Sequence, residues 1–113
     1  MERTMTTFTT NMEKIMTTFT WDQNILTFTF DEHMDSKSST KAEKIISQTI
    51  NKKSPQKIIF DLNNVNYAAS EFLRICVTMA KKMDKKDFSI INSQHSIKKI
   101  FKLSGLEKFL NIS

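Results

Sequence analysis

Glycine, proline and cysteine are almost absent from this sequence of 113 residues, which contains one of each. So little glycine excludes the glycine-rich loops with which many proteins hold phosphate groups. The single cysteine, Cys76, excludes an internal disulfide and is typical of a protein from a reducing compartment. Histidine is also rare, since His33 and His95 are the only two and lie far apart in the sequence. No Ser-His-Asp spacing and no pair of carboxylates indicates a catalytic site.

Long apolar runs are missing as well. No run approaches the roughly 20 residues that cross a membrane as a helix, and the amino-terminal segment has no apolar core of a signal peptide. We therefore expect a cytoplasmic protein that does not insert into a membrane. Basic residues exceed acidic ones by five (17 against 12), but the lysines are spread over several segments. Such spreading favours a solvated surface, so we expect no direct binding of nucleic acid.

Two short features resemble reactive sites only superficially. His33 lies in the acidic segment 31–35, but no second His or Cys stands at the spacing of metal ligands, so we interpret this segment as a solvated loop. Cys76 falls on the apolar face of a predicted helix, which is typical of a structural cysteine and not of a nucleophile. We therefore expect no enzymatic activity, no bound metal and no cofactor.

A repeated pentapeptide is the most conspicuous feature that the sequence does contain. Met-Thr-Thr-Phe-Thr occurs at residues 5–9 and again, letter for letter, at residues 16–20. The periods of solenoid repeats are about 20 residues or more, so two copies this close indicate a duplicated strand at most. Residues 1–15 then have three interpretations. They are a leader, an additional edge strand that could pair between two chains in a homodimer, or a segment upstream of a translation start at Met12 or Met16.

Alternation of apolar and polar residues predicts two antiparallel strands, at residues 16–20 and 25–30, joined by a turn at residues 21–24. Either copy of the pentapeptide could pair with the second of these strands. Asp35 and the hydroxyl residues after it can cap a helix that ends before Pro55. One face of this helix is formed by residues at helical spacing: Ala42, Ile45, Ile46, Thr49 and Ile50.

The second half of the chain alternates between strands and helices. The apolar run at residues 57–62 is typical of a strand buried on both faces, and residues 88–91 form another short strand. Ser96 caps a third helix, Gly105 follows it where a positive φ is favoured, and residues 106–112 form a final turn or short helix. Between the two strands a helix begins at about Ala69, with a buried face formed by Phe72, Ile75, Cys76, Met79 and Met83.

This order of elements predicts an α/β protein with one domain over residues 16–113. We expect a mixed β-sheet of about four strands, in which an amino-terminal antiparallel hairpin is followed by parallel crossovers. The helices should pack mainly on one face of the sheet, because the strands are short and the helices few.

Two segments of the chain resemble the STAS domain, the fold shared by anti-sigma factor antagonists and the cytoplasmic tails of sulfate transporters. The segment KIIFDLNNVNYAASEFLRICVTMAKKM, residues 57–83, is similar to the family's strand ending in Asp-Leu, its short connection with an aromatic residue, and its Ser-containing loop that opens a helix. The segment SIKKIFKLSGLEKFLNI, residues 96–112, resembles the family's closing basic helix, Ser-Gly-Leu corner and terminal amphipathic turn.

The resemblance also implies a site at the start of the second helix. The family's motif Asp-Ser-Ser-Gly-Leu falls on residues 69–73, where the chain keeps the phosphorylatable Ser as Ser70 and the Leu as Leu73. An acidic residue of the family falls on Asp35, which would lie close to this loop. The implied partner-binding residues beside Ser70 are Asp35, Asn66, Ala69, Glu71, Phe72 and Arg74.

By this resemblance the chain is a bacterial regulatory protein that binds a serine-kinase type of anti-sigma factor. In the family the unphosphorylated form sequesters the anti-sigma factor and so releases a sigma factor for transcription, and phosphorylation weakens the complex. Ser70 keeps two interpretations, as a phosphorylated switch or as a plain helix N-cap. A second function also stays open, in which the chain is an accessory subunit that binds the ATPase of an ABC transporter without being phosphorylated.

Overall fold

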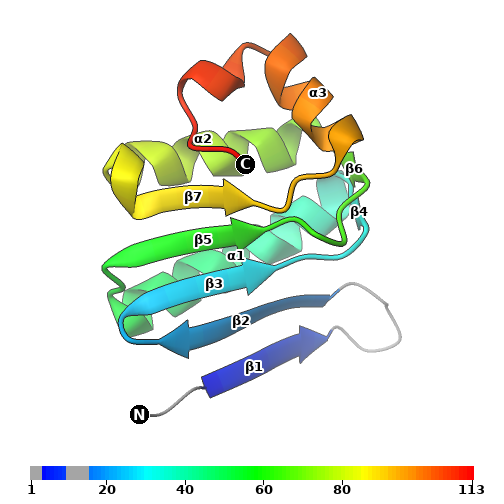
Figure 1. The fold of residues 1–113 in the computed structure, drawn as a ribbon. Coiled ribbons are helices and arrows are strands. Elements are labelled where there is room, and N and C mark those ends of the chain that lie inside the picture. The colour runs from blue at the N-terminus through cyan, green and yellow to red at the C-terminus, as the bar shows by residue number, and fades with distance from the viewer. Residues whose placement is uncertain (1–3, 10–15) are drawn as a thin grey trace.

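A five-stranded sheet in the order β1-β2-β3-β5-β7 lies at the centre of the computed structural model, which describes residues 4–9 and 16–113 (Figure 1). Its strands are β1 (Thr4–Thr9), β2 (Met16–Asp22), β3 (Ile25–Thr29), β5 (Lys57–Asp61) and β7 (Phe88–Ile91). The pairs β1–β2 and β2–β3 are antiparallel, whereas β3–β5 and β5–β7 are parallel. The predicted α/β fold with an amino-terminal hairpin and parallel crossovers is confirmed. The sheet has one strand more than expected.

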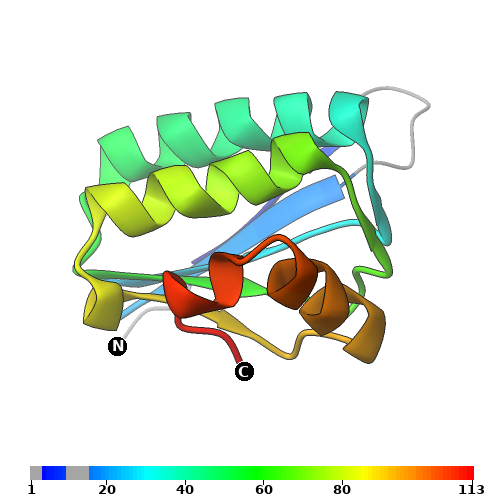
Figure 2. The same ribbon diagram turned by 90° about the horizontal axis from the view of Figure 1, so that it is seen from above.

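Three helices pack against this sheet. They are α1 (Ser36–Lys53), α2 (Ser70–Lys82) and α3 (His95–Leu103). Figures 1 and 2 show α1 and α2 side by side on one face, while α3 lies near the end of the sheet formed by β7. The remaining elements are short: β4 (His33–Met34) pairs with β6 (Tyr67–Ala68), and the 3-10 helices are η1 (Lys85–Asp87) and η2 (Leu106–Lys108).

The hairpin turn is tighter than the sequence predicts. Trp21 and Asp22 belong to β2 and not to the turn, which consists of Gln23 and Asn24 alone. Both residues have a positive φ, 53° and 66°. Two-residue hairpins favour this conformation because its backbone twist matches the right-handed twist of the paired strands. The prediction of a four-residue turn was therefore wrong.

Burial along β5 also differs from the prediction. Ile58 and Phe60 are fully buried, but Ile59 and Asp61 on the other face are only half-buried. Because α1 and α2 cover one face of the sheet, the opposite face of this strand stays accessible to solvent. The expectation of a strand buried on both faces was wrong.

The end of the chain covers the outer edge of β7. After α3, Gly105 adopts the predicted positive φ, 76°, but Gln94 and not Ser96 is the N-cap residue of α3. The backbone N–H of Ile90 donates to the carbonyl oxygen of Asn111 at 2.8 Å, and the N–H of Ser113 donates to the carbonyl oxygen of Ile90 at 2.9 Å. This edge of the sheet is therefore closed by residues 111–113.

Phenylalanine rings form the centre of the core. The Phe60 ring lies 4.9 Å from that of Phe88 and 5.0 Å from that of Phe30, between ring centroids, with Phe28 and Phe72 at 5.9 and 6.2 Å. The first three of these pairs are edge-to-face and the pair with Phe72 is stacked, and aromatic pairs of both kinds add to the free energy of apolar burial. Phe60 on β5, which lies between β3 and β7, thus joins these two strands and α2.

We expect Phe60→Ala to lower the free energy of unfolding by about 3–5 kcal/mol, because it removes a fully buried ring and leaves a cavity. Urea denaturation followed by circular dichroism measures this loss. Phe109→Ala is the matched control, since Phe109 is 68% exposed and a surface change of this kind should stay within about 0.5 kcal/mol. Equal losses in the two variants would contradict this description of the core.

Asp35 caps α1 with its side chain. The backbone N–H of Ser38 donates to Asp35 Oδ1 at 2.9 Å, and this bond is the main reason that the pKa of the Asp35 carboxyl lies below its ordinary value of 3.8. The Ser38 hydroxyl and the nearby His33 lower this pKa further. A folded pKa below the unfolded one means that the cap stabilises the protein fully above pH 4 or so and loses that effect as the pH falls through the lowered pKa.

Asp35→Asn should therefore make the free energy of unfolding depend less on pH under acidic conditions. The amide oxygen can still accept the bond from Ser38, but it does not titrate. Urea midpoints measured from pH 7 down to about pH 2 should fall more steeply for the unchanged chain than for the variant. Parallel profiles would show that the Asp35 carboxylate is not linked to folding.

Candidate functional site

The two-residue pair β4–β6 brings the beginnings of α1 and α2 together. His33 lies opposite Tyr67 and Met34 opposite Ala68 in parallel register. The backbone N–H of Asn66 donates to the carbonyl oxygen of Glu32 at 2.8 Å, and that of Ala69 donates to the carbonyl oxygen of Met34 at 2.9 Å. Asp35, directly after β4, therefore lies beside the loop that opens α2, as the sequence implied.

Ser70 is the first residue of α2 and is exposed. The N-cap residue is Ala69, which has no side-chain oxygen to accept a bond, so the interpretation of Ser70 as a plain N-cap was wrong. Its hydroxyl lies 3.5 Å from Glu71 Oε1. The hydroxyl is thus presented at the surface and is not used to hold the helix start.

Glu71 links the starts of the two helices. The pKa of its carboxyl is lowered, first by a hydrogen bond from its own backbone N–H and then by one from the Ser36 hydroxyl. The Ser70 hydroxyl and the positive charge of Arg74 act in the same direction. Glu71 is therefore ionised at neutral pH, and Ser70, Glu71 and Arg74 line an open hollow of about 340 Å³.

Phe72 does not belong to this surface. Its side chain is fully buried, and its ring lies 5.1 Å from that of Phe30 between centroids. The inclusion of Phe72 among the partner-binding residues was wrong, because the residue points into the core. The other five implied residues surround or adjoin Ser70: Asp35 and Ala69 are half-buried, Asn66 and Arg74 are exposed, and Glu71 is half-buried.

An exposed aromatic pair was missed from the sequence. The rings of His33 and Tyr67 stack with their centroids 4.4 Å apart, and Tyr67 is 43% exposed. The pair adjoins Asn66 at the same edge of the molecule. The sequence offered one signal, the aromatic residue Tyr67 in the connection before α2. Nothing in the sequence indicated that His33 would stack against it.

Residues with reactive side chains elsewhere have structural surroundings. Cys76 is fully buried in α2, and burial raises the pKa of its thiol, so the sulfur stays protonated. This confirms the prediction of a structural cysteine, and Met79, also buried, confirms the predicted core face of α2. Over residues 4–9 and 16–113 no cluster of three His, Cys, Asp or Glu side chains could hold a metal ion.

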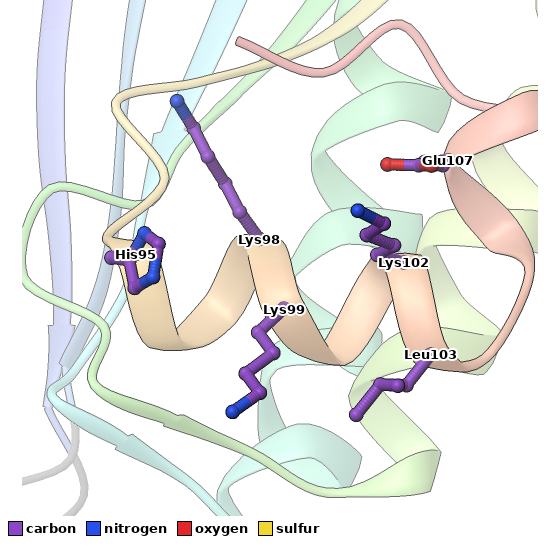
Figure 3. A pocket seen from close by; sticks show the side chains of 6 residues that line it. All are labelled: His95, Lys98, Lys99, Lys102, Leu103 and Glu107. Atoms are coloured by element: carbon purple, nitrogen blue, oxygen red, sulfur yellow. The ribbon is translucent and has the colours of Figure 1, made fainter.

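A second hollow, of about 450 Å³, lies along α3 (Figure 3). Its lining is mostly basic and consists of His95, Lys98, Lys99, Lys102, Leu103 and Glu107. In Figure 3 Lys98 and Lys99 extend to opposite sides of the helix, and Lys102 points toward Glu107. Because these ammonium groups do not converge on one point, we interpret them as a solvated basic face, as the sequence predicted.

No helix in the part of the chain that the structure describes has both the length and the apolar character needed to span a membrane.

Comparison with known proteins reveals the same architecture. The family model of the STAS domain matches residues 17–113. An anti-sigma factor antagonist from Mycobacterium paratuberculosis superposes with a TM-score of 0.74 at 18% identity, covering 96% of this chain and 85% of that one.

The anti-sigma factor antagonist SpoIIAA is similar in an unphosphorylated and in a phosphorylated form. The unphosphorylated form gives a TM-score of 0.67, with coverage of 81% of this chain and 82% of that one. The phosphorylated form, from Bacillus, gives 0.61, with 81% and 85%. Both are 14% identical to this chain, so the likeness is one of fold. Together with the family match over most of the sequence, it shows that this chain belongs to the STAS domain family.

Proposed function

We propose that this STAS domain is a regulatory protein-binding module of the anti-sigma factor antagonist kind, which docks through the start of α2 and the adjoining pair β4–β6. One observation carries the proposal: the Ser70 hydroxyl is exposed at the first residue of α2, free of any capping role, beside an open polar hollow. The fold shared with solved anti-sigma factor antagonists supports it. In this role the protein acts in the bacterial cytoplasm and contacts no nucleic acid directly.

The partner of this surface is a serine-kinase type of anti-sigma factor. Such a kinase transfers the γ-phosphoryl group of ATP to the Ser70 oxygen, which loses its proton, and ADP is released. A phosphate there lies at a helix start, where free N–H groups and the helix dipole stabilise an anion. Arg74, one turn further along α2, supplies a positive charge.

The ionised Glu71 carboxylate gives the switch its electrostatic character. Phosphorylation adds a charge of about −1.5 to −2 to a hollow that already contains Glu71. The unphosphorylated surface is complementary to a partner that can bind next to the Glu71 carboxylate. The same partner binds more weakly when a doubly charged phosphate on Ser70 is added beside it. A difference of a few kcal/mol between the two forms is enough to reverse such an equilibrium.

We expect the chain to gain one phosphate when it is incubated with ATP and a serine-kinase anti-sigma factor from the same genome. Intact-mass analysis and peptide mapping should place it on Ser70. Ser70→Ala should remain unmodified, whereas the control Ser96→Ala, which alters an exposed serine in the first turn of α3, should be modified like the unchanged chain. Phosphate on another residue, or none, would overturn the switch.

Docking itself is tested by Arg74→Ala. We expect the dissociation constant of the complex with the anti-sigma factor to rise about 10-fold, or ~1.4 kcal/mol, because an arginine at the centre of an interface contributes energy of this order. Isothermal titration calorimetry measures the change. Lys98→Ala on α3 is the control and should bind like the unchanged chain, so equal effects would place the partner elsewhere.

Co-purification from the native host separates this function from the alternative that the sequence left open. Capture of a kinase-like anti-sigma factor supports the proposal. Capture of an ABC-type ATPase instead supports an accessory role without phosphorylation, which the fixed charge of Glu71 beside Ser70 favours.

A further inference from the structure

The two copies of the repeated pentapeptide pair with each other. In the antiparallel register of β1 and β2, Met5 lies opposite Thr20, Thr7 opposite Thr18, and Thr9 opposite Met16. The central residue of one copy therefore faces the central residue of the other. The hairpin has a local two-fold axis through the pair Thr7–Thr18, and the sequence Met-Thr-Thr-Phe-Thr is complementary to itself in this register.

The same sequence is presented a second time at the free edge of the sheet. Figure 1 shows β1 at the end of the sheet opposite to β7. The β7 edge is closed by residues 111–113, and β2 is paired on both sides. No strand among residues 4–9 and 16–113 pairs with the outer edge of β1. A row of unpaired backbone N–H and C=O groups is a template for another strand.

We propose that β1 is a self-recognition strand, through which two copies of this chain pair edge to edge. The partner is a second copy because the edge carries the sequence that the structure already shows pairing with itself. The family match begins at residue 17, so β1 lies before the matched segment, and its outer edge is available for this purpose. The proposal concerns a surface separate from the Ser70 site and does not depend on the proposed function.

Symmetry limits the registers that this pairing can adopt, and the register of β1 with β2 selects one of them. Hydrogen-bonded and non-hydrogen-bonded pairs alternate along an antiparallel ladder. Two identical strands related by a two-fold axis must therefore be centred on one residue that faces its own copy, because a register centred between two residues would require neighbouring pairs of the same kind. Repeating the register of β1 with β2 places Thr7 opposite Thr7 of the second copy. The interface is isologous and closes at two chains, with a continuous ten-stranded sheet.

Cysteine cross-linking tests the register. Thr7→Cys should form a disulfide-linked dimer under mild oxidation that reductant reverses, because directly opposed residues have Cα atoms about 4.5–5.5 Å apart, within the range for a disulfide. Thr9→Cys is the matched control. Its two copies would be separated by four residues, or roughly 14 Å along the strand, and should stay unlinked. The native Cys76 is fully buried and does not interfere.

Charge repulsion tests the dimer without a cross-link. Light scattering over a range of concentrations should show a dimer of the unchanged chain, and Thr7→Lys should raise its dissociation constant at least 10-fold because like charges face each other across the axis. Thr9→Lys, with its charges far apart, should have a smaller effect. A monomer at every concentration, assembly beyond two chains, or equal cross-linking of Thr7→Cys and Thr9→Cys would overturn the proposal.

Discussion

The site depends on a few backbone hydrogen bonds between two loops. The segment 32–34 accepts and the segment 66–69 donates, and this short ladder holds the starts of α1 and α2 side by side. Everything of functional interest at this end of the molecule follows from that pairing. Asp35 caps one helix, Ser36 reaches the carboxylate of Glu71 on the other, and the Ser70 hydroxyl is presented beside them. Backbone bonds of this kind do not depend on side-chain identity, so the arrangement does not require particular side chains around Ser70.

The core reinforces the same arrangement from beneath. Where the STAS motif commonly has a glycine, this chain has Phe72, whose ring packs against Phe30 and Phe60. The start of α2 is therefore anchored by an aromatic side chain two residues after Ser70. A change in the position of Ser70 would have to move this ring within a close-packed interior. We interpret the site as a rigid surface, so the proposed phosphorylation of Ser70 would act by adding charge and not by changing the shape of the surface.

Local periodicity predicted the elements whose burial has a regular spacing. The helical spacing correctly placed four residues on the inner face of α2: Phe72, Ile75, Cys76 and Met79. The position of Phe72 in the STAS motif had suggested instead that it belongs to the partner surface, and the spacing contradicted that. Periodicity was the better guide, because it follows from burial. Features without a regular spacing were not predictable. The strands β4 and β6 have only two residues each, and the closure of β7 by residues 111–113 is a long-range contact. The caps of α2 and α3 depend on backbone angles and not on the nearest hydroxyl.

The two-residue turn at Gln23 and Asn24 has a consequence for how the chain assembles. Both copies of the pentapeptide are chemically able to pair with β3, but only the second is joined to it by a two-residue turn, whereas the first would have to close a connection of 15 residues (10–24). The difference in closure entropy is about 2 kcal/mol, and β2 also contributes the pairs of Trp21 and Asp22. The lower closure cost favours the second copy beside β3, and the first copy pairs with β2 at the outer position of the sheet. The turn thus decides which of two identical segments lies inside the sheet and which lies at its edge.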